Sequence, residues 1–338
     1  MFFRRHLIRA LLLCVLAAAA ASCKEENGVK VTSFSFKGTK AVTAGQLRSV
    51  LATSASSRLP WGQRRYFSRD QFEADLKRIV AFYRDRGFPD ARVTSFDVKL
   101  NDTQTAVDIT VNISEGEAIL VERVTFTGFE SLPEQHRTAL ETQLPLKTGQ
   151  PLDRARLQAS REAALDELKD HGFPYASVRI AENPGSSDRQ RVIELTADAG
   201  PLSRFGPIEI QGNTSVSDRI VRRQLTFRPG QLFRQSALQE SQRKLYGPEL
   251  FDFANVEPLR SDDRPVDVPT RVTVTEGKHR KVNFGVGYGS EEKARVQIDW
   301  RHVNFFGGAR TVSVQARYSS LDKGVRVNFR EPYFFGPL

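Results

Sequence analysis

Two hydrophobic periods alternate along the chain and predict a recurring order of strands and helices. In the middle of the chain they predict, in order, a strand at 121–127, a short helix at 132–144, a longer helix from 153, and a closing hairpin at 175–181 and 191–197. The longer helix carries an apolar stripe at helical spacing, formed by Leu157, Ala164, Leu165 and Leu168. Gly172 ends this helix, because glycine is the usual C-cap residue.

The same order recurs three times, and three landmarks mark each copy. They are a first strand ending before Gly38, Gly128 or Gly212, a helix ending at Gly87, Gly172 or Gly247, and a turn after the last strand at Gly116, Gly200 or Gly277. Ordered landmarks in three copies indicate a repeat protein. A unit of roughly 80 residues can bury its own core when two helices cover one sheet. The predicted fold class is therefore α+β, with β-α-α-β-β modules at 28–118, 119–202 and 203–280.

The first copy carries an extra stretch at residues 54–67, which contains Trp61, Arg64 and Arg65. Its polar and basic composition is typical of a solvated loop. A contact surface is the alternative interpretation.

From Lys281 onward the pattern changes to strict alternation, which predicts four consecutive antiparallel strands. In the first of them the apolar residues Val282, Phe284, Val286 and Tyr288 alternate with Asn283, Gly285 and Gly287. An apolar face opposite a polar one is typical of a lipid-facing barrel wall. A soluble sheet with one buried face has the same alternation, but no helix remains in the sequence to cover it. Residues 281–338 are therefore predicted to be the first four strands of an outer-membrane β-barrel.

Four strands do not close a membrane barrel, because the smallest have eight and an open edge leaves backbone groups unpaired in lipid. We therefore expect the chain to be a fragment of a longer protein or an unusual short product.

The first 22 residues are predicted to be a signal peptide. Three arginines precede an apolar core at 10–21, which is too short to cross a bilayer as a helix. Cys23 follows small residues, so it is a candidate for lipidation. Ordinary cleavage near Ser22, with Cys23 incidental, is the alternative, and the sequence leaves both open.

The chain has a net charge of +10, which would suit a nucleic-acid binder. Its arginines are spread along the chain among acids, however, and an exported protein does not meet nucleic acid. The five histidines, at positions 6, 136, 171, 279 and 302, have no metal-ligand spacing in the sequence. Neither a Gly-x-Ser-x-Gly motif nor a phosphate-binding loop is present. We therefore predict no catalytic residue, metal site or cofactor, and a protein that is not an enzyme.

Taken together, the motifs resemble a known superfamily. The repeated modules resemble POTRA domains, and three of them before a barrel resemble the TamA branch of the BamA/TamA outer-membrane assembly superfamily. Asn304-Phe305-Phe306-Gly307 is similar to the turn after the family's second barrel strand, and Glu331-Pro332-Tyr333-Phe334 to the motif after its fourth. The resemblance covers residues 28 to 338. It departs from the family in length, because the family's complete barrel has sixteen strands.

The resemblance implies an outer-membrane protein with periplasmic POTRA domains that assembles or translocates other proteins. Its partners would be unfolded outer-membrane or secreted clients, a periplasmic or inner-membrane protein, and outer-membrane lipid, with no nucleic acid. Clients would bind by strand addition to exposed sheet edges. The candidate edges are the second strands of the closing hairpins and the first strands, with Val31, Phe34 and Phe36 as candidate residues in module 1.

The first barrel strand would form one side of the family's lateral seam, with Val282, Phe284, Gly285, Val286, Gly287 and Tyr288 as its candidate residues. Its glycines weaken side-chain packing, which would help a seam to open. Small residues that suit a crowded barrel interior are the alternative interpretation.

Two other functions remain open at this stage. One is an exported, lipid-anchored or soluble, periplasmic POTRA scaffold without a working barrel. The other is a two-partner secretion pore, although such pores usually carry two POTRA modules and a plug helix.

Overall fold

The computed structural model describes residues 28–57, 59, 61–291 and 293–332. The predicted signal peptide, Cys23 and residues 333–338 lie outside them. By their contacts the described residues form two compact units, one containing those up to Val121 with Gly149–Ala155 and Ser186–Gln190, the other the remainder. None of the helices in the described part of the chain is long and apolar enough to cross a membrane.

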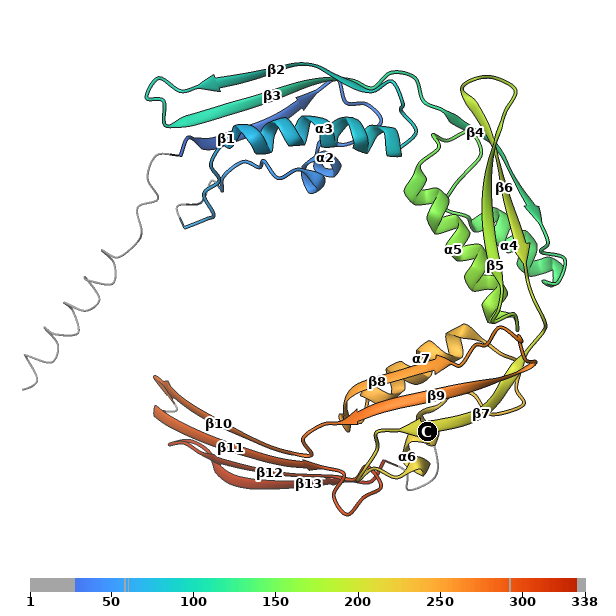
Figure 1. The fold of residues 1–338 in the computed structure, drawn as a ribbon. Coiled ribbons are helices and arrows are strands. Elements are labelled where there is room, and N and C mark those ends of the chain that lie inside the picture. The colour runs from blue at the N-terminus through green and yellow to red at the C-terminus, as the bar shows by residue number, and fades with distance from the viewer. Residues whose placement is uncertain (1–27, 58, 60, 292, 333–338) are drawn as a thin grey trace, which may run out of the picture. The chain divides into compact units, whose positions relative to one another are not determined.

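Three modules with the predicted order of elements follow one another along the chain (Figure 1). Module 1 comprises β1 (Lys30–Lys37), α2 (Ala44–Val50), α3 (Arg69–Asp85), β2 (Arg92–Leu100) and β3 (Ala106–Ser114). Module 2 comprises β4 (Leu120–Thr127), α4 (Glu134–Gln143), α5 (Arg154–Asp170), β5 (Ser177–Pro184) and β6 (Gln190–Asp198). Module 3 comprises β7 (Arg204–Gln211), α6 (Asp218–Gln224), α7 (Gln235–Tyr246), β8 (Phe251–Pro258) and β9 (Asp267–Glu276).

Each module has one three-stranded sheet, and its last strand lies in the centre. The strand orders are β1-β3-β2, β4-β6-β5 and β7-β9-β8. The first strand of modules 1 and 3 runs parallel to the central strand, while the hairpin partner runs antiparallel to it. The expectation that the second hairpin strands are edges is therefore wrong. β3, β6 and β9 have neighbours on both sides, so the edges are the first strand and the first hairpin strand.

The long helix of module 1 illustrates how the sequence builds a module. Ser68 begins α3 as its N-cap, with its side chain accepting a hydrogen bond from the Gln71 N–H. Phe72, Ile79 and Tyr83 recur at helical spacing and are buried against the sheet. A helix with one apolar stripe gains stability only by covering such a surface, which fixes its place on the sheet.

The glycine that ends each first strand has a geometric reason. Gly38, Gly128 and Gly212 have φ between +82° and +86°, a left-handed conformation. A Cβ atom on any of them would lie 2.0–2.1 Å from a backbone carbonyl oxygen of the central strand. Only glycine fits there, which explains why this landmark recurs in all three modules.

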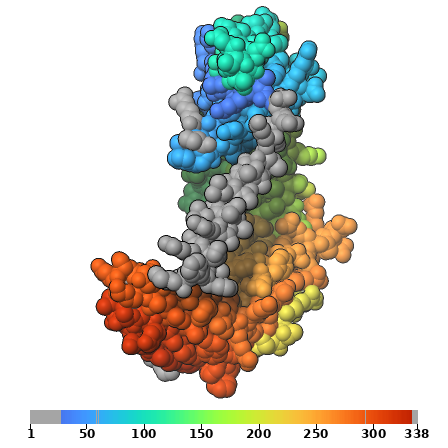
Figure 2. All heavy atoms as spheres, turned by 90° about the vertical axis from the view of Figure 1, so that its left-hand side faces the viewer, coloured from blue at the N-terminus to red at the C-terminus, as the bar shows by residue number. Residues whose placement is uncertain are grey.

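The fourth sheet consists of β10 (Arg280–Gly289), β11 (Lys293–Val303), β12 (Thr311–Tyr318) and β13 (Lys323–Arg330), paired antiparallel in chain order. Its register places apolar residues opposite one another across all four strands, for example Val282, Trp300, Val314 and Val327. Their strands form one continuous surface, orange to red in Figure 2. The sheet adjoins module 3, because Val303 and Ala309 are part of that module's buried core.

The predicted lipid-facing row of this sheet is open to solvent. The side chains of Val282, Phe284, Val286 and Tyr288 are between 66% and 79% exposed. A row of large apolar side chains that is exposed in this way marks a surface that contacts a partner or a membrane. The observed fold thus confirms the α+β modules and a final sheet that resembles the start of a barrel.

Candidate strand-addition edges

The candidate residues Val31, Phe34 and Phe36 lie in β1, an edge strand of module 1. Val31 and Phe34 are buried in the core of their own module. Their side chains are therefore not available to a client, and what the edge offers is backbone. An edge strand presents N–H and C=O groups that a further strand can pair with.

The beginning of each first strand is already paired on its outer side. In module 1 the N–H of Val31 donates to the Arg65 carbonyl at 2.9 Å, and the N–H of Ser56 donates to the Val31 carbonyl at 2.8 Å. Ser56 and Arg65 of the extra stretch thus cover the start of β1, although Trp61 of the same stretch is 82% exposed. The backbone N–H and carbonyl groups of Val121 and Phe205 are paired in the same way with backbone groups of the loops before α5 and α7. Within the described residues, these contacts leave the later half of each first strand for a new partner.

An arginine covers part of that later half in modules 1 and 3. The Nη2 atom of Arg48, on α2, donates to the carbonyl of Phe34 at 3.0 Å. The Nη2 atom of Arg222, on α6, donates to the carbonyl of Ile208 at 3.1 Å. In both modules the carbonyl lies four residues before the landmark glycine and the arginine ten residues after it. A guanidinium bound there competes with any incoming strand for the same acceptor.

Module 2 lacks this arginine. At the same distances from Gly128 lie Val124, whose carbonyl is equivalent to the two carbonyls above, and Thr138 on α4, which stands at the position of the arginine. The Thr138 hydroxyl donates instead to the carbonyl of Glu134 in its own helix, at 3.1 Å. Among the described residues no side chain covers the Val124 carbonyl, so β4 has the most open edge of the three first strands.

A groove of about 680 Å³ lies along this open edge. Val124, Thr125 and Phe126 of β4 form one wall, and Glu141 and Thr142 of α4 belong to the other. Its lining combines apolar side chains with hydroxyls and charges. Such a groove can hold the side chains of an extended peptide while the backbone pairs with β4.

The seam residues predicted in the last sheet lie in β10, which is paired on one side only, with β11. An added Cβ at Gly285 or Gly289 would meet no atom within 4 Å, and one at Gly287 would meet only the Arg295 side chain, at 3.5 Å. Crowding within the described residues therefore does not explain these glycines. Their part in a seam stays a prediction.

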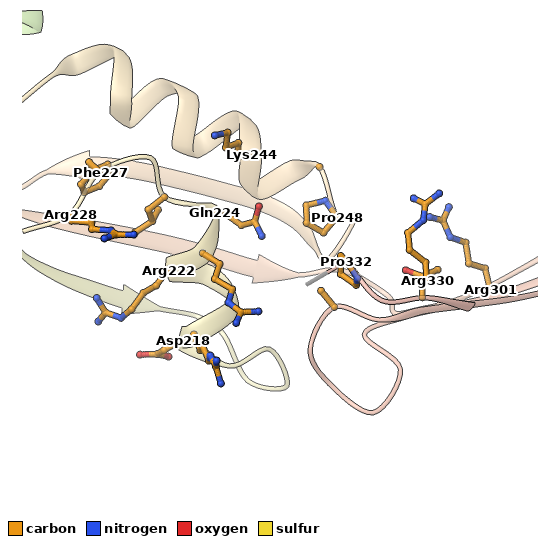
Figure 3. Close-up of a pocket in the computed structure, with 16 residues that line it drawn as sticks. Asp218, Arg222, Gln224, Phe227, Arg228, Lys244, Pro248, Arg301, Arg330 and Pro332 are labelled. Atoms are coloured by element: carbon orange, nitrogen blue, oxygen red, sulfur yellow. The ribbon is translucent and has the colours of Figure 1, made fainter. Parts of the chain in front are cut away.

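A basic pocket of about 1040 Å³ lies where module 3 meets the last sheet (Figure 3). Among the described residues, its lining includes one acid, Asp218, and several cations, among them Arg222, Arg228, Lys244, Arg301 and Arg330. Arg301 and Arg330 project to the same side of the last sheet (Figure 3). Part of the charge is already paired, since Arg301 lies 3.1 Å from Glu249. The remaining positive charge favours anionic groups.

The structure also brings together residues that the sequence prediction missed. His136 on α4 and His171 at the end of α5 lie on either side of Glu167, although 35 positions separate them. The expectation of no metal site was based on the spacing of the histidines along the sequence, which does not show residues that folding brings together. The signal that could have found the cluster is the pairing of Glu167 with His171 one helical turn later, on a helix expected to pack beside the one that carries His136.

The POTRA family model, described as a surface antigen variable number repeat, matches residues 29–116, 119–197 and 203–277. The chain belongs to the POTRA family. The three matched segments cover most of the chain and coincide with the three modules.

Two relatives are outer membrane assembly factors. A putative outer membrane protein assembly factor of Treponema pallidum is 25% identical over 322 residues, which are 93% of this chain and 38% of that protein. BamA of Neisseria meningitidis serogroup B is 21% identical over 311 residues, 92% of this chain and 39% of that protein. The chain thus spans about two fifths of the length of these relatives. Homology to them assigns this POTRA protein to the outer membrane, with its POTRA domains in the periplasm.

A solved structure supports the fold. BamA from Haemophilus ducreyi lacking POTRA domains 1–3 matches with a TM-score of 0.53 and 22% identity, over 62% of this chain and 40% of that one. At this identity the likeness concerns the fold alone. The BamA/TamA superfamily resemblance is confirmed, whereas the TamA-type assignment stays a prediction.

Proposed function

We propose that this POTRA protein is the front part of an outer membrane protein assembly or translocation factor. Its relatives are described as assembly factors. Its clients would be unfolded outer-membrane or secreted proteins, which reach the periplasm as extended chains. A periplasmic or inner-membrane protein and outer-membrane lipid would be its other partners. This role requires binding and release of polypeptide, and it requires no bond chemistry, cofactor or nucleic acid.

The open edge of β4 is the observation that carries the mechanism. An extended client gains backbone hydrogen bonds by pairing with β4, and such bonds do not depend on the client's sequence. Val124 and Phe126 offer backbone groups there beside a groove, with no arginine in place at the Val124 carbonyl. The equivalent carbonyls in modules 1 and 3 are occupied by Arg48 and Arg222. We infer that module 2 is the principal site of strand addition.

The last sheet would receive the client in the same way. β10 is an edge of a sheet whose apolar side chains are exposed. A client strand added at β10 would continue this sheet, and lipid would cover the apolar row. Strand addition would then serve both in the periplasm and at the membrane.

Exchanging the residues at the arginine position tests this proposal. A short alternating apolar and polar peptide, labelled with a fluorophore, is titrated with the full chain in detergent micelles. T138R should close the β4 edge, because the new guanidinium would compete with the peptide for the Val124 carbonyl. Loss of that one backbone hydrogen bond should weaken peptide binding about tenfold. R48T should open the β1 edge and strengthen binding.

The control is Q143R, at the exposed last residue of α4, which is not among the residues that line the groove. It adds the same charge without reaching the equivalent carbonyl position. Equal effects of T138R and Q143R would mean that charge alone matters, and unchanged binding in T138R would reject β4 as the principal edge. A periplasmic scaffold without a working barrel would bind the peptide but leave no heat-modifiable outer-membrane form.

A further inference from the structure

Three side chains of module 2 form a cluster of metal-ligand type. The Glu167 Oε1 atom lies 2.9 Å from Nδ1 of His136 and 3.5 Å from Nδ1 of His171. The two imidazole ring centroids are 4.0 Å apart. The three side chains are between 24% and 34% exposed, so the cluster is partly buried and still reachable from solvent. Two imidazoles and one carboxylate are a ligand set that zinc uses in proteins.

The geometry is close to that of a bound ion. One ligand atom from each of the three residues lies within 4.8 Å of the other two. Ligands of a tetrahedral zinc ion, at about 2.0–2.2 Å from the metal, are about 3.3–3.6 Å from one another. Small side-chain rotations would close that difference. Glu167 lies on α5 and His171 directly follows the end of that helix, four positions later, so the two side chains lie on the same side of the helix end.

The surroundings already orient one ligand. The Nδ1 atom of His171 lies 2.8 Å from the backbone carbonyl oxygen of Glu167. A proton on Nδ1, donated to that carbonyl, leaves Nε2 free as the ligand atom. Histidines that bind metals are commonly fixed in this way by a hydrogen bond from their other ring nitrogen.

The POTRA fold does not itself require these residues. Counting from the landmark glycines, module 1 has Gln46, Phe82 and Arg86 at the three positions, and module 3 has Ile220, Gln242 and Tyr246. In module 1 the Arg86 guanidinium lies 3.4 Å from the centre of the Phe82 ring, so a cation–π contact takes the place of the cluster. The ligand set is therefore particular to module 2.

We propose that His136, Glu167 and His171 bind a Zn²⁺ ion that ties α4 to α5. Three protein ligands leave a fourth position, open to water or to a side chain of a binding partner. The site is separate from the β4 edge and does not depend on the proposed assembly function. Bound zinc would stabilise module 2, because the ion binds the folded arrangement and not the unfolded chain.

The test is a calorimetric titration of the full chain with ZnCl₂ alone, in detergent micelles after treatment with EDTA. We expect saturable binding of one Zn²⁺ per chain. H136A, H171A and E167Q should each weaken it at least tenfold, since even loss of a supporting group costs about 10–100-fold. H302A, which removes a histidine of β11 outside the cluster, should bind Zn²⁺ like the wild type.

A second measurement separates ligation from a structural role. Co²⁺ added to the wild type should give the visible absorption of a four-coordinate site, and E167Q, which keeps its size and hydrogen bonding, should lose it. Zinc should also raise the melting temperature of the wild type and not that of E167Q. The proposal is overturned if the wild type does not bind Zn²⁺ saturably, or if the three variants bind it as tightly as H302A does.

Discussion

Glu276 shows how single residues secure a module. Its Oε1 atom accepts hydrogen bonds from the backbone N–H groups of Thr214, Ser215 and Val216, at 2.6–2.8 Å, and the Ser215 hydroxyl donates to Oε2. This carboxylate closes the loop after β7 and explains the glutamate before the turn glycine. Glu115 does the same in module 1, where it accepts from the N–H groups of Lys40 and Ala41.

These bonds predict a pH dependence in module 3. Burial by itself would raise the pKa of Glu276, but the hydrogen bonds from Ser215 and from the backbone lower it from 4.5 to about 2. Because the pKa is depressed in the folded state, the stabilisation is present above pH 4.5 and is lost as the pH falls toward 2. The full effect is about 3 kcal/mol.

We expect the amides of module 3 to lose protection from hydrogen exchange between pH 4.5 and 2 in the wild type. E276Q should be less protected at pH 7 and should change little over that range, whereas E257Q, at an exposed position of β8, should behave like the wild type. Equal pH profiles for the wild type and E276Q would show that Glu276 is not the group responsible.

At the scale of elements, the last sheet has two unlike faces. Phe284 is 67% exposed on the apolar face, where its strand neighbours across the sheet are Ile298 and Ala316. Asn283 precedes it and points to the polar face, in register with Asp299. An arginine on a lipid-facing position costs about 2–4 kcal/mol at the bilayer midplane, while lumen positions tolerate charge.

F284R should therefore lower the amount of protein recovered from the outer membrane, and N283R should not. The measurement is the heat-modifiable band of the outer-membrane fraction, compared at equal expression. If both arginines reduced that band equally, the apolar row would not be the lipid-facing one.

The order of elements in each module could be predicted from the sequence, because each element depends on local signals. The alternation in 121–127, the helix-ending Gly172 and the three strand-ending glycines are all visible without a structure, and each predicts the beginning or end of an element that is present. The identity of the edges was not visible in this way. It depends on strand order, and β3 reaches the centre of its sheet only because β1 pairs with it from the far side.

The candidate sites required the structure for the same reason. Arg48 and Phe34 are close in sequence, yet nothing in their types shows that one covers the carbonyl of the other. His136 and Glu167 come from two helices. Both arrangements depend on how a helix packs on its sheet, and hydrophobic period alone does not define that packing to the level of single atoms.

At the scale of the whole molecule, three POTRA modules precede a sheet that resembles the start of a barrel. Module 3 and the last sheet share buried residues, with Val303 and Ala309 in the module's core. Arg301 and Lys281 of the sheet also pair with Glu249 of the module. A shared core indicates that this module and the sheet fold together.

The central claim is that client chains bind at the open edge of module 2. The most direct measurement places a photo-crosslinking amino acid at Thr125 in β4, and at the equivalent positions Ser35 in β1 and Glu209 in β7, and irradiates living cells. The account predicts crosslinks to newly exported outer-membrane proteins at position 125, well above those at 35 and 209. Equal crosslinking at all three positions, or none at 125, would contradict it.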